Sequence, residues 1–237
     1  MKSIYNPDYI EDLFDKMSAS YARMNYITSF GFSTRWRRQC VQSINIPAGA
    51  TVADLMTGMG ECWSDILNET GKGGRIIALD FSEGMLQHAY KRLTKMQNAR
   101  IDILKANVFD NEIPDQSVDA VISGFGIKTF SESQLTDLAN EIHRILKPGG
   151  SFSLIDVSVP TPGLLRRLYM FYLKNIIPIL GWLFLGNPET YKMLGIYTEH
   201  FQNSEKATEI FRKEGFEVEM TRFFYGCATG IKGKRQG

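Results

Sequence analysis

Cysteine is scarce in this chain of 237 residues, which has only three. Cys40, Cys62 and Cys227 lie far apart, and no two of them have the CxxC spacing. A scattered, odd-numbered set predicts neither a disulfide framework nor a zinc site. We therefore expect no metal centre.

An excess of charge of one sign is also lacking. Lys plus Arg number 27 and Asp plus Glu number 26, so the formal net charge is +1. Proteins that bind nucleic acids usually carry a strong basic patch. The composition therefore disfavours a nucleic-acid partner.

Long uninterrupted apolar runs are missing as well. The first ten residues have no apolar core of the kind found in secretory signals, so we expect a cytoplasmic protein. Residues 164–186 are apolar and aromatic, but Arg166, Arg167, Lys174 and Pro178 interrupt them, which weakens a membrane-span interpretation. We expect a single domain over residues 1–237.

Strand-like and helix-like segments alternate through the middle of the chain. Short apolar strands are predicted at 51–55, 75–80, 101–105, 118–123 and 151–157, with helices between them, and two further strands at 216–225 and 227–232. Strict alternation of this kind is typical of a doubly wound α/β fold with a mostly parallel sheet, here of seven strands.

Helical segments flank and interrupt this alternation. Residues 1–46 read as an N-terminal cap with two amphipathic helices around a turn at Thr28 to Gly31, and residues 47–160 as a ligand-binding core. Residues 161–202 form a helical insertion on the acceptor side, and residues 203–237 a closing helix and strands. The run Lys147 to Gly150 predicts a turn before the fifth strand.

The stretch VADLMTGMGECW (residues 52–63) joins a predicted strand to a glycine-bearing turn. It does not match the dinucleotide fingerprint GxGxxG, because Glu61 or Trp63 stands where the third glycine should be. Asp54 also places a carboxylate where a phosphate would be repelled. S-adenosylmethionine suits this turn better, since it has a cationic amino-acid end and a ribose that Asp80, after the second strand, could bind. A purely structural turn, with Asp54 as a helix cap, is the alternative.

Several motifs in order resemble the class I S-adenosylmethionine-dependent methyltransferases, and most closely the ubiquinone and menaquinone biosynthesis C-methyltransferases. They are FxxMSASYARMN (14–25), DLMTGMG (54–60), ALDFSEGML (78–86), Ala106-Asn107, SGFGIKTF (123–130) and EIHRILKPGG (141–150). The resemblance covers nearly the whole chain and implies a Rossmann-like methyltransferase fold.

The resemblance also implies which residues hold S-adenosylmethionine. Those around its methionine part would be Asp54, Thr57, Gly58, Gly60 and Ser123. Asp80 would bind the ribose, Phe81 would pack beside the adenine, Asn107 and Val108 would recognise its edge, and Tyr21 would close over it.

Three positions depart from the usual family pattern. Met56 replaces a small residue and is expected to narrow the pocket, and Ala22 replaces the aspartate that usually follows Tyr21. Lys128-Thr129 replaces an Arg-Asn pair near the expected acceptor, which puts quinone specificity in question more than methyl transfer.

The acceptor implied by the resemblance is a hydrophobic small molecule, such as a prenylated quinol methylated on a ring carbon. A base near the ring would help, and His200, Tyr197 and Lys128 are the candidates. Alternatives are a small-molecule C-, O- or N-methyltransferase of specialised metabolism, and a non-catalytic binding subunit with the same fold.

Residues 164–186 leave four interpretations open. They could line an acceptor pocket, touch a membrane surface, form a homodimer interface, or simply be buried within the helical cap.

Overall fold

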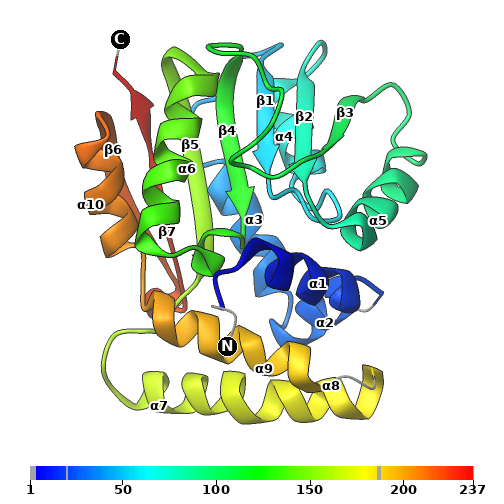
Figure 1. Cartoon of the computed structure of the whole chain (residues 1–237), viewed down its shortest axis with the longest axis vertical. Coiled ribbons are helices and arrows are strands. Elements are labelled where there is room, and N and C mark those ends of the chain that lie inside the picture. Colours follow the sequence, from blue (N-terminus) through cyan, green and yellow to red (C-terminus); the bar gives the residue numbers. More distant parts are fainter. Residues whose placement is uncertain (1–3, 20, 186–187, 237) are drawn as a thin grey trace.

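A seven-stranded sheet forms the centre of the protein (Figure 1). The computed structural model describes residues 4–19, 21–185 and 188–236. Ser20, Gly186 and the side chain of Ala22, all within stretches quoted above, lie outside this part. The strands are β1 (Thr51–Leu55), β2 (Arg75–Asp80), β3 (Arg100–Lys105), β4 (Val118–Gly124), β5 (Leu146–Val157), β6 (Phe216–Phe223) and β7 (Ala228–Arg235).

The strand order is β3-β2-β1-β4-β5-β7-β6. Strands β1 to β5 are parallel, whereas β7 runs antiparallel to both β5 and β6. The predicted seven-stranded, mostly parallel sheet is therefore confirmed. The order reverses between β1 and β4, and ligands of open α/β sheets bind beyond the carboxyl ends of the strands at such a point.

Helices cover both faces of the sheet, and others lie beyond the carboxyl ends of its parallel strands. They are α1 (Pro7–Met17), α2 (Tyr21–Thr28), α3 (Phe32–Val41), α4 (Trp63–Thr70), α5 (Glu83–Leu93), α6 (Glu132–Ile145), α7 (Leu164–Phe171), α8 (Ile177–Leu185), α9 (Pro188–Phe201) and α10 (Glu205–Lys213). Shorter turns are η1 (Ile127–Thr129), η2 (Tyr172–Ile176) and η3 (Phe224–Gly226), of which η2 is a π-helical turn.

Two apolar layers fix the helices to the sheet. On one face, Val52 and Ile76 pack with residues of α3, α4 and α5, including the fully buried Trp63. On the other face, residues of α6 and α10 pack with Val121 and Phe152. Strands covered on both faces are expected to be almost wholly apolar, so the buried Asp54 in β1 is unusual.

The N-terminal segment differs from the two helices predicted for it, because it forms three. The turn predicted at Thr28 to Gly31 is present, with left-handed backbone at Phe30 and Gly31. An additional break follows α1, where the Ser18 hydroxyl donates a hydrogen bond to the Asp15 carbonyl at 2.8 Å. Such side-chain bonds compete with the next helical turn.

The predicted turn at Lys147 to Gly150 is instead the irregular start of β5. The strand begins at Leu146, and its register against β4 shifts between Val118 and Ala120. Gly149 has a φ of 76°, which glycine adopts without strain. The predicted turn is therefore wrong, because these residues form an irregular part of the strand.

A helical cap lies beyond the carboxyl ends of the parallel strands. In Figure 1, β1 and β4 point downward toward α1, α2 and the group α7 to α9. Leu13 and Met17 of α1 share an apolar cluster with Leu173 and Ile177 and with Tyr197 of α9. Residues of α1 and of the segment from η2 to α9, far apart in the sequence, thus close over the switch point. No helix in the described part of the chain is long and apolar enough to cross a membrane.

Candidate functional site

The loop after β1 is shaped by left-handed backbone. Met56 has a φ of 54°, Gly58 of 59° and Gly60 of 76°. A Cβ added at Gly60 would lie 2.5 Å from the ring of Trp63, so only glycine fits there. Met56 is not a glycine, and strain of this kind is typical of ligand-binding sites. The loop therefore brings backbone close to the switch point.

Asp54 lies beneath this loop. It is 1% exposed, its Oδ2 accepts a hydrogen bond from the Thr57 hydroxyl, and its Oδ1 has no hydrogen-bond partner among the described residues. The same hydroxyl accepts a bond from Trp63 Nε1 at 2.8 Å. Burial raises the pKa of Asp54 to about 7. Asp54 therefore fixes the loop through its hydrogen bond with Thr57 and does not itself line the pocket.

Asp80 ends β2 and faces the same loop. Its Oδ2 accepts a hydrogen bond from Gly58 N at 2.8 Å, and its Oδ1 accepts one from Ser82 N at 3.0 Å. Burial raises the pKa of Asp80 to about 6, against these two hydrogen bonds, which lower it. Each oxygen retains a lone pair for a ligand hydroxyl.

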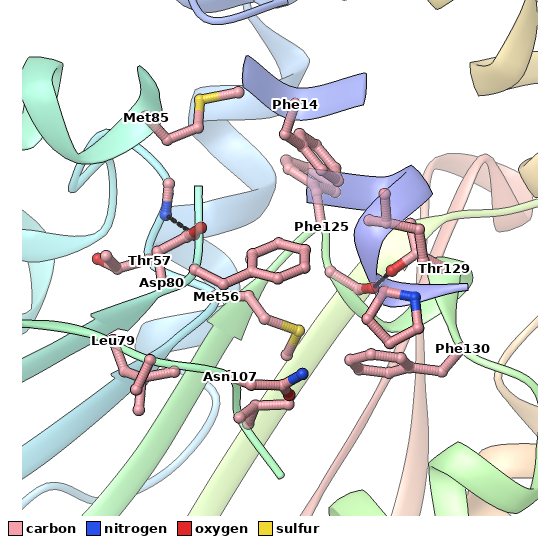
Figure 2. Close-up of a pocket in the computed structure, with 18 of the residues that line it drawn as sticks. Phe14, Met56, Thr57, Leu79, Asp80, Met85, Asn107, Phe125, Thr129 and Phe130 are labelled. Atoms are coloured by element: carbon pink, nitrogen blue, oxygen red, sulfur yellow. Dashed lines mark hydrogen bonds between the residues drawn. The ribbon is translucent and has the colours of Figure 1, made fainter. Parts of the chain in front are cut away.

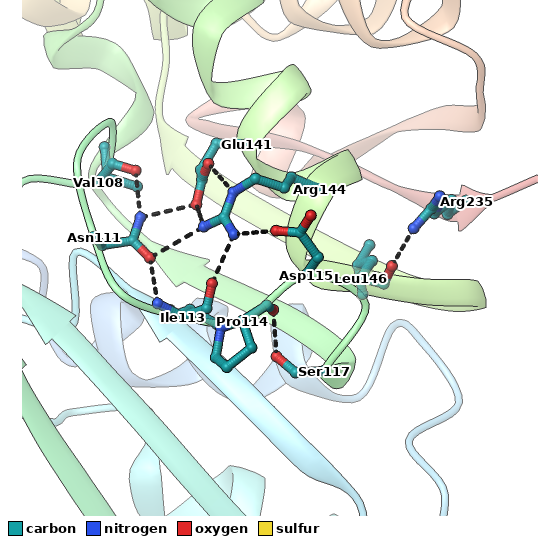
Figure 3. A network of polar contacts seen from close by, with 10 residues as sticks. All are labelled: Val108, Asn111, Ile113, Pro114, Asp115, Ser117, Glu141, Arg144, Leu146 and Arg235. Atoms are coloured by element: carbon teal, nitrogen blue, oxygen red, sulfur yellow. Dashed lines mark hydrogen bonds and ion pairs between the residues drawn. The ribbon is translucent and has the colours of Figure 1, made fainter.

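Asn107 and Val108 follow β3 on a loop that is anchored from outside. Arg144 of α6 donates to Ile113 O at 2.7 Å and pairs with Glu141 at 2.6 Å (Figure 3). Asn111 donates to Val108 O at 2.9 Å and to Glu141 at 2.8 Å. This network fixes the loop that presents Asn107 and Val108 to the switch point.

These strand ends surround a first pocket (Figure 2). Figure 2 shows the Met56 side chain reaching into its middle, between Asp80 and Phe130. Seven of the predicted binding residues line it: Tyr21, Thr57, Gly58, Asp80, Phe81, Asn107 and Val108. The lining does not include Asp54, Gly60 or Ser123. Ser123 is fully buried, and within the described part of the chain its hydroxyl has no hydrogen-bond partner.

The lining also includes residues that were not predicted to bind the cofactor, among them Arg37, Glu61 and Phe125. Arg37, 5% exposed, pairs with Glu61 at 3.3 Å and lies over the Phe125 ring with its guanidinium carbon 4.5 Å from the centroid. Burial, the largest single influence, lowers the pKa of Arg37, but Glu61, Tyr21, Cys62 and Asp54 together outweigh it, so the pKa is raised. Arg37 belongs to a basic run on α3 that reads as a solvated face, so sequence alone gave little signal for it.

A second, apolar pocket of about 340 Å³ adjoins the first. It lies between the N-terminal helices and the segment from α7 to α9, and its aromatic lining includes Trp36, Tyr169 and Tyr172. Phe14, Tyr21, Phe125 and Thr129 line both pockets. A pocket that has charged groups in its wall (Arg37, Glu61 and Asp80) and a more apolar pocket therefore share a common wall at the switch point.

The three predicted catalytic candidates have different positions. Lys128 and Tyr197 line the second pocket, whereas His200 is exposed at the end of α9 and lines neither pocket. The Tyr197 hydroxyl donates to Ile4 O, and burial raises its pKa, so it is poorly suited to act as a base. The structure therefore does not support His200 or Tyr197 as the base.

Lys128 is held by a buried carboxylate. Its Nζ lies 2.8 Å from Asp156 Oδ1 and 3.1 Å from Phe125 O, and its backbone N donates to Asp156 Oδ2 at 2.9 Å. An ammonium has three protons, so one remains beyond these two acceptors. A lysine paired in this way is a cation rather than a base.

Comparison with known proteins identifies the family. The profile of the ubiE/COQ5 methyltransferase family matches residues 2–233. The chain belongs to this family. The family resemblance inferred from the motifs is thereby confirmed, and the protein is an S-adenosylmethionine-dependent methyltransferase.

Relatives within the ubiE/COQ5 family cover the full length. The chain is 31% identical over 229 residues to a demethylmenaquinone methyltransferase of Lactiplantibacillus plantarum, covering 96% of both chains. It is 33% identical over 211 residues to one of Lactococcus lactis subsp. lactis, covering 89% of this chain and 83% of the other. A methyltransferase from Thermotoga maritima, described as a possible histamine N-methyltransferase, has the same fold, with a TM-score of 0.64, 18% identity and coverage of 95% and 99%.

The first pocket fits the cofactor of this family. S-adenosylmethionine has ribose hydroxyls, an adenine and a zwitterionic amino-acid end. Asp80 can accept from the hydroxyls, and Arg37 and Glu61, which line the same pocket, offer both charges to the amino-acid end.

Proposed function

We propose that this methyltransferase acts on a ring carbon of a hydrophobic aromatic acceptor, and that this acceptor is a prenylated quinol. The observation that carries the proposal is the wall shared by the two pockets. It allows a polar cofactor and an apolar ring to meet at Phe14, Tyr21, Phe125 and Thr129. The relatives named demethylmenaquinone methyltransferases support the same acceptor class.

We further propose a role for each wall of the site. Asp80, with Asn107 and Val108, holds the nucleoside end, while Arg37 and Glu61 hold the amino-acid end. Bound S-adenosylmethionine supplies an electrophilic methyl group. The aromatic lining orients the acceptor ring and excludes water, and positioning of this kind can contribute about 7–11 kcal/mol.

Of the described residues that line the second pocket, Lys128 alone carries a formal charge. A quinol ring carbon becomes a better nucleophile as a ring hydroxyl loses its proton. The remaining N–H of Lys128 is suited to donate to that oxygen and stabilise its negative charge. Lys128 would therefore favour the quinolate without itself removing the proton.

The test begins with calorimetric titration of the protein with S-adenosylhomocysteine. Micromolar binding that Asp80→Ala abolishes is the expected result, and the control Asp102→Ala removes an exposed carboxylate of the neighbouring strand. The protein is then incubated with S-adenosylmethionine and a short-chain prenylated naphthoquinol, beside a catechol and an amine.

A ring-methylated quinol found by mass spectrometry supports the proposal. Methylation of the catechol or the amine alone would replace it with an O- or N-methyltransferase. No methylation of any acceptor, despite cofactor binding, would contradict the acceptor class.

A further inference from the structure

Helices α7 and α8 join through the π-helical turn η2 into one continuous helical segment, residues 164–185. In Figure 1 this segment lies at the outer edge of the cap, below α9. Five large apolar side chains on it are 52% to 71% exposed: Leu164, Leu168, Phe171, Ile179 and Trp182. Their spacing of three, four or eight residues places them along one side of the helix, as an exposed stripe that Asn175 interrupts between Phe171 and Ile179.

The opposite side of the same segment is buried. Leu173 and Ile177 are 3% and 2% exposed, and both line the apolar second pocket. The segment is therefore the wall between that pocket and the surroundings, apolar on both sides. Burial within the cap explains its inner side and leaves the outer stripe unexplained.

Charge on the segment is of one sign. Residues 163–185 contain Arg166, Arg167 and Lys174 and no Asp or Glu. Lys174 pairs with Glu199 of α9 at 2.6 Å, whereas Arg167 is exposed beside the stripe. Among the residues that the structure describes, no ion pair neutralises Arg166 or Arg167, so the apolar stripe and these arginines complement a surface that offers both an apolar layer and negative charge.

We propose that the stripe of α7 and α8 lies in the interface of an anionic lipid bilayer. An interfacial helix buries its apolar side at the level of the headgroups while basic residues contact anionic lipid. Tryptophan favours this position, and Trp182 is 63% exposed. From Leu164 to Trp182 the stripe extends roughly 27 Å at 1.5 Å per residue, long enough to lie along a surface.

A second apolar site beside the segment extends the same surface. Phe30, in the turn after α2, is 81% exposed and its ring lies 6.2 Å from that of Tyr172. Phe30 also lines the second pocket. An exposed lining residue next to the stripe gives an apolar molecule in the bilayer a route to the pocket.

A second copy of the chain is the rival occupant. In a two-fold dimer the same patch faces itself. That contact would bring together two segments that each carry three cations and no anions, and like charges across an interface are unfavourable. The lipid surface therefore fits the observed charge better.

The inference goes beyond the proposed reaction and does not depend on it, because its test measures no turnover. Trp182 is the exposed member of the three tryptophans, since Trp36 and Trp63 are 5% and 0% exposed. The full chain is mixed with vesicles of phosphatidylcholine, with and without phosphatidylglycerol. Sedimentation with the anionic vesicles, a blue shift of the fluorescence and quenching by brominated lipid are expected.

Variants locate the contact. Leu168→Glu/Phe171→Glu is expected to weaken vesicle binding at least tenfold, and Arg166→Gln/Arg167→Gln to weaken it on anionic vesicles only. Tyr90→Glu, at an exposed aromatic residue of α5, is the matched control and should bind like the wild type. Unchanged S-adenosylhomocysteine affinity shows that the folded core is intact.

Absence of binding to both vesicle types would overturn the inference, and so would equal weakening by the control. A dimer found by analytical ultracentrifugation without lipid, and abolished by Leu168→Glu/Phe171→Glu, would assign the stripe to a second copy instead. Quenching of Trp182 in the unmodified protein remains decisive even if a variant fails to fold.

Discussion

Lys128 Nζ and Asp156 Oδ1 lie 2.8 Å apart, with both side chains almost completely buried. The lysine lines the apolar pocket, and Asp156, on β5, is fully buried behind it. Two buried charges of this kind are stable only together, because each alone would be uncompensated in a medium of low dielectric. The pair therefore delivers a fixed positive charge to an otherwise apolar pocket.

Variants at Lys128 and Asp156 distinguish an effect of the ion pair on stability from an effect on catalysis. Lys128→Met leaves Asp156 without its partner, and breaking a buried pair typically destabilises a protein by about 3–5 kcal/mol. In Lys128→Met/Asp156→Asn neither charge remains, so most of that stability should return. We expect the double variant to bind S-adenosylhomocysteine normally and to lose about 100-fold or more in kcat, as when an oxyanion donor is removed.

Urea unfolding, calorimetry and initial rates on the same samples check this prediction. Lys128→Arg keeps a cation and should retain part of the activity. Substantial turnover in the double variant would show that the pair serves folding alone.

Met56 is expected to restrict cofactor binding. Its side chain reaches into the first pocket, and its sulfur lies 2.5 Å from where a Cβ on Gly126 would be. Met56→Ala removes the obstruction while keeping a side chain at the same backbone position. Affinity for S-adenosylhomocysteine should rise several-fold by calorimetry, and Met56→Gly should behave alike because it also relieves the positive φ. Equal or weaker binding by both variants would show that Met56 contributes contacts to the cofactor.

The sheet and the position of Asp80 could be predicted because local signals sufficed. Apolar strands, the breaks between them and the acid that ends β2 place Asp80 at a strand end whatever the tertiary details. The contribution of Arg37 to the first pocket could not be predicted, because Arg37 comes from α3, which lies outside the alternating strands and helices of the core. Nothing in a run of arginines distinguishes the buried member from its exposed neighbours.

Which side chains of the motifs face the pocket could not be predicted either. Asp54, Gly60 and Ser123 all occur in the expected motifs, yet none lines the first pocket. Because side chains alternate along a strand, the Asp54 side chain lies on the face covered by α4. There it accepts a hydrogen bond from Thr57, which in turn accepts one from Trp63. The usual pKa of a histidine makes His200 a candidate base, but that pKa says nothing about where the side chain lies, and α9 leaves it exposed.

Gly60 and Gly49 test whether close packing shapes the loop. Both have a φ near 75°, but a Cβ at Gly60 would meet the Trp63 ring and one at Gly49 would meet nothing within 4 Å. Both alanine variants carry the strain of a left-handed residue. Gly60→Ala should therefore lower the free energy of unfolding by roughly 1–3 kcal/mol more than Gly49→Ala, as overpacking does. Equal loss in urea unfolding would mean that the Trp63 ring moves aside freely.

Asp54 predicts an unusual dependence of stability on pH. Burial raises its pKa from 3.8 to about 7 in the folded protein, so the folded state retains a proton that the unfolded state has released. Its contribution to stability is present below pH 4 and is lost as pH rises to 7, at about 1.4 kcal/mol for each unit of pKa shift. Asp54→Asn should therefore be more stable than the wild type at pH 8 and not at pH 4. The control is Asp102→Asn, at an exposed position, and a gain that is the same at both pH values would contradict the argument.

Asp80 should make the affinity for the cofactor rise with pH, whereas the contribution of Asp54 to stability falls. Its pKa of about 6 leaves much of the carboxyl protonated at pH 5, and only the ionised form offers all its lone pairs to the ribose hydroxyls. Hydrogen bonds from those hydroxyls favour the charged form, so binding should release a proton near pH 6. Affinity for S-adenosylhomocysteine should rise up to tenfold per pH unit below 6 and level off above 7. Calorimetry in two buffers of different ionisation enthalpy measures the proton release, which Asp80→Asn should abolish and Asp54→Asn should retain. A proton release that survives in Asp80→Asn would assign the titration to another group and remove Asp80 from the ribose site.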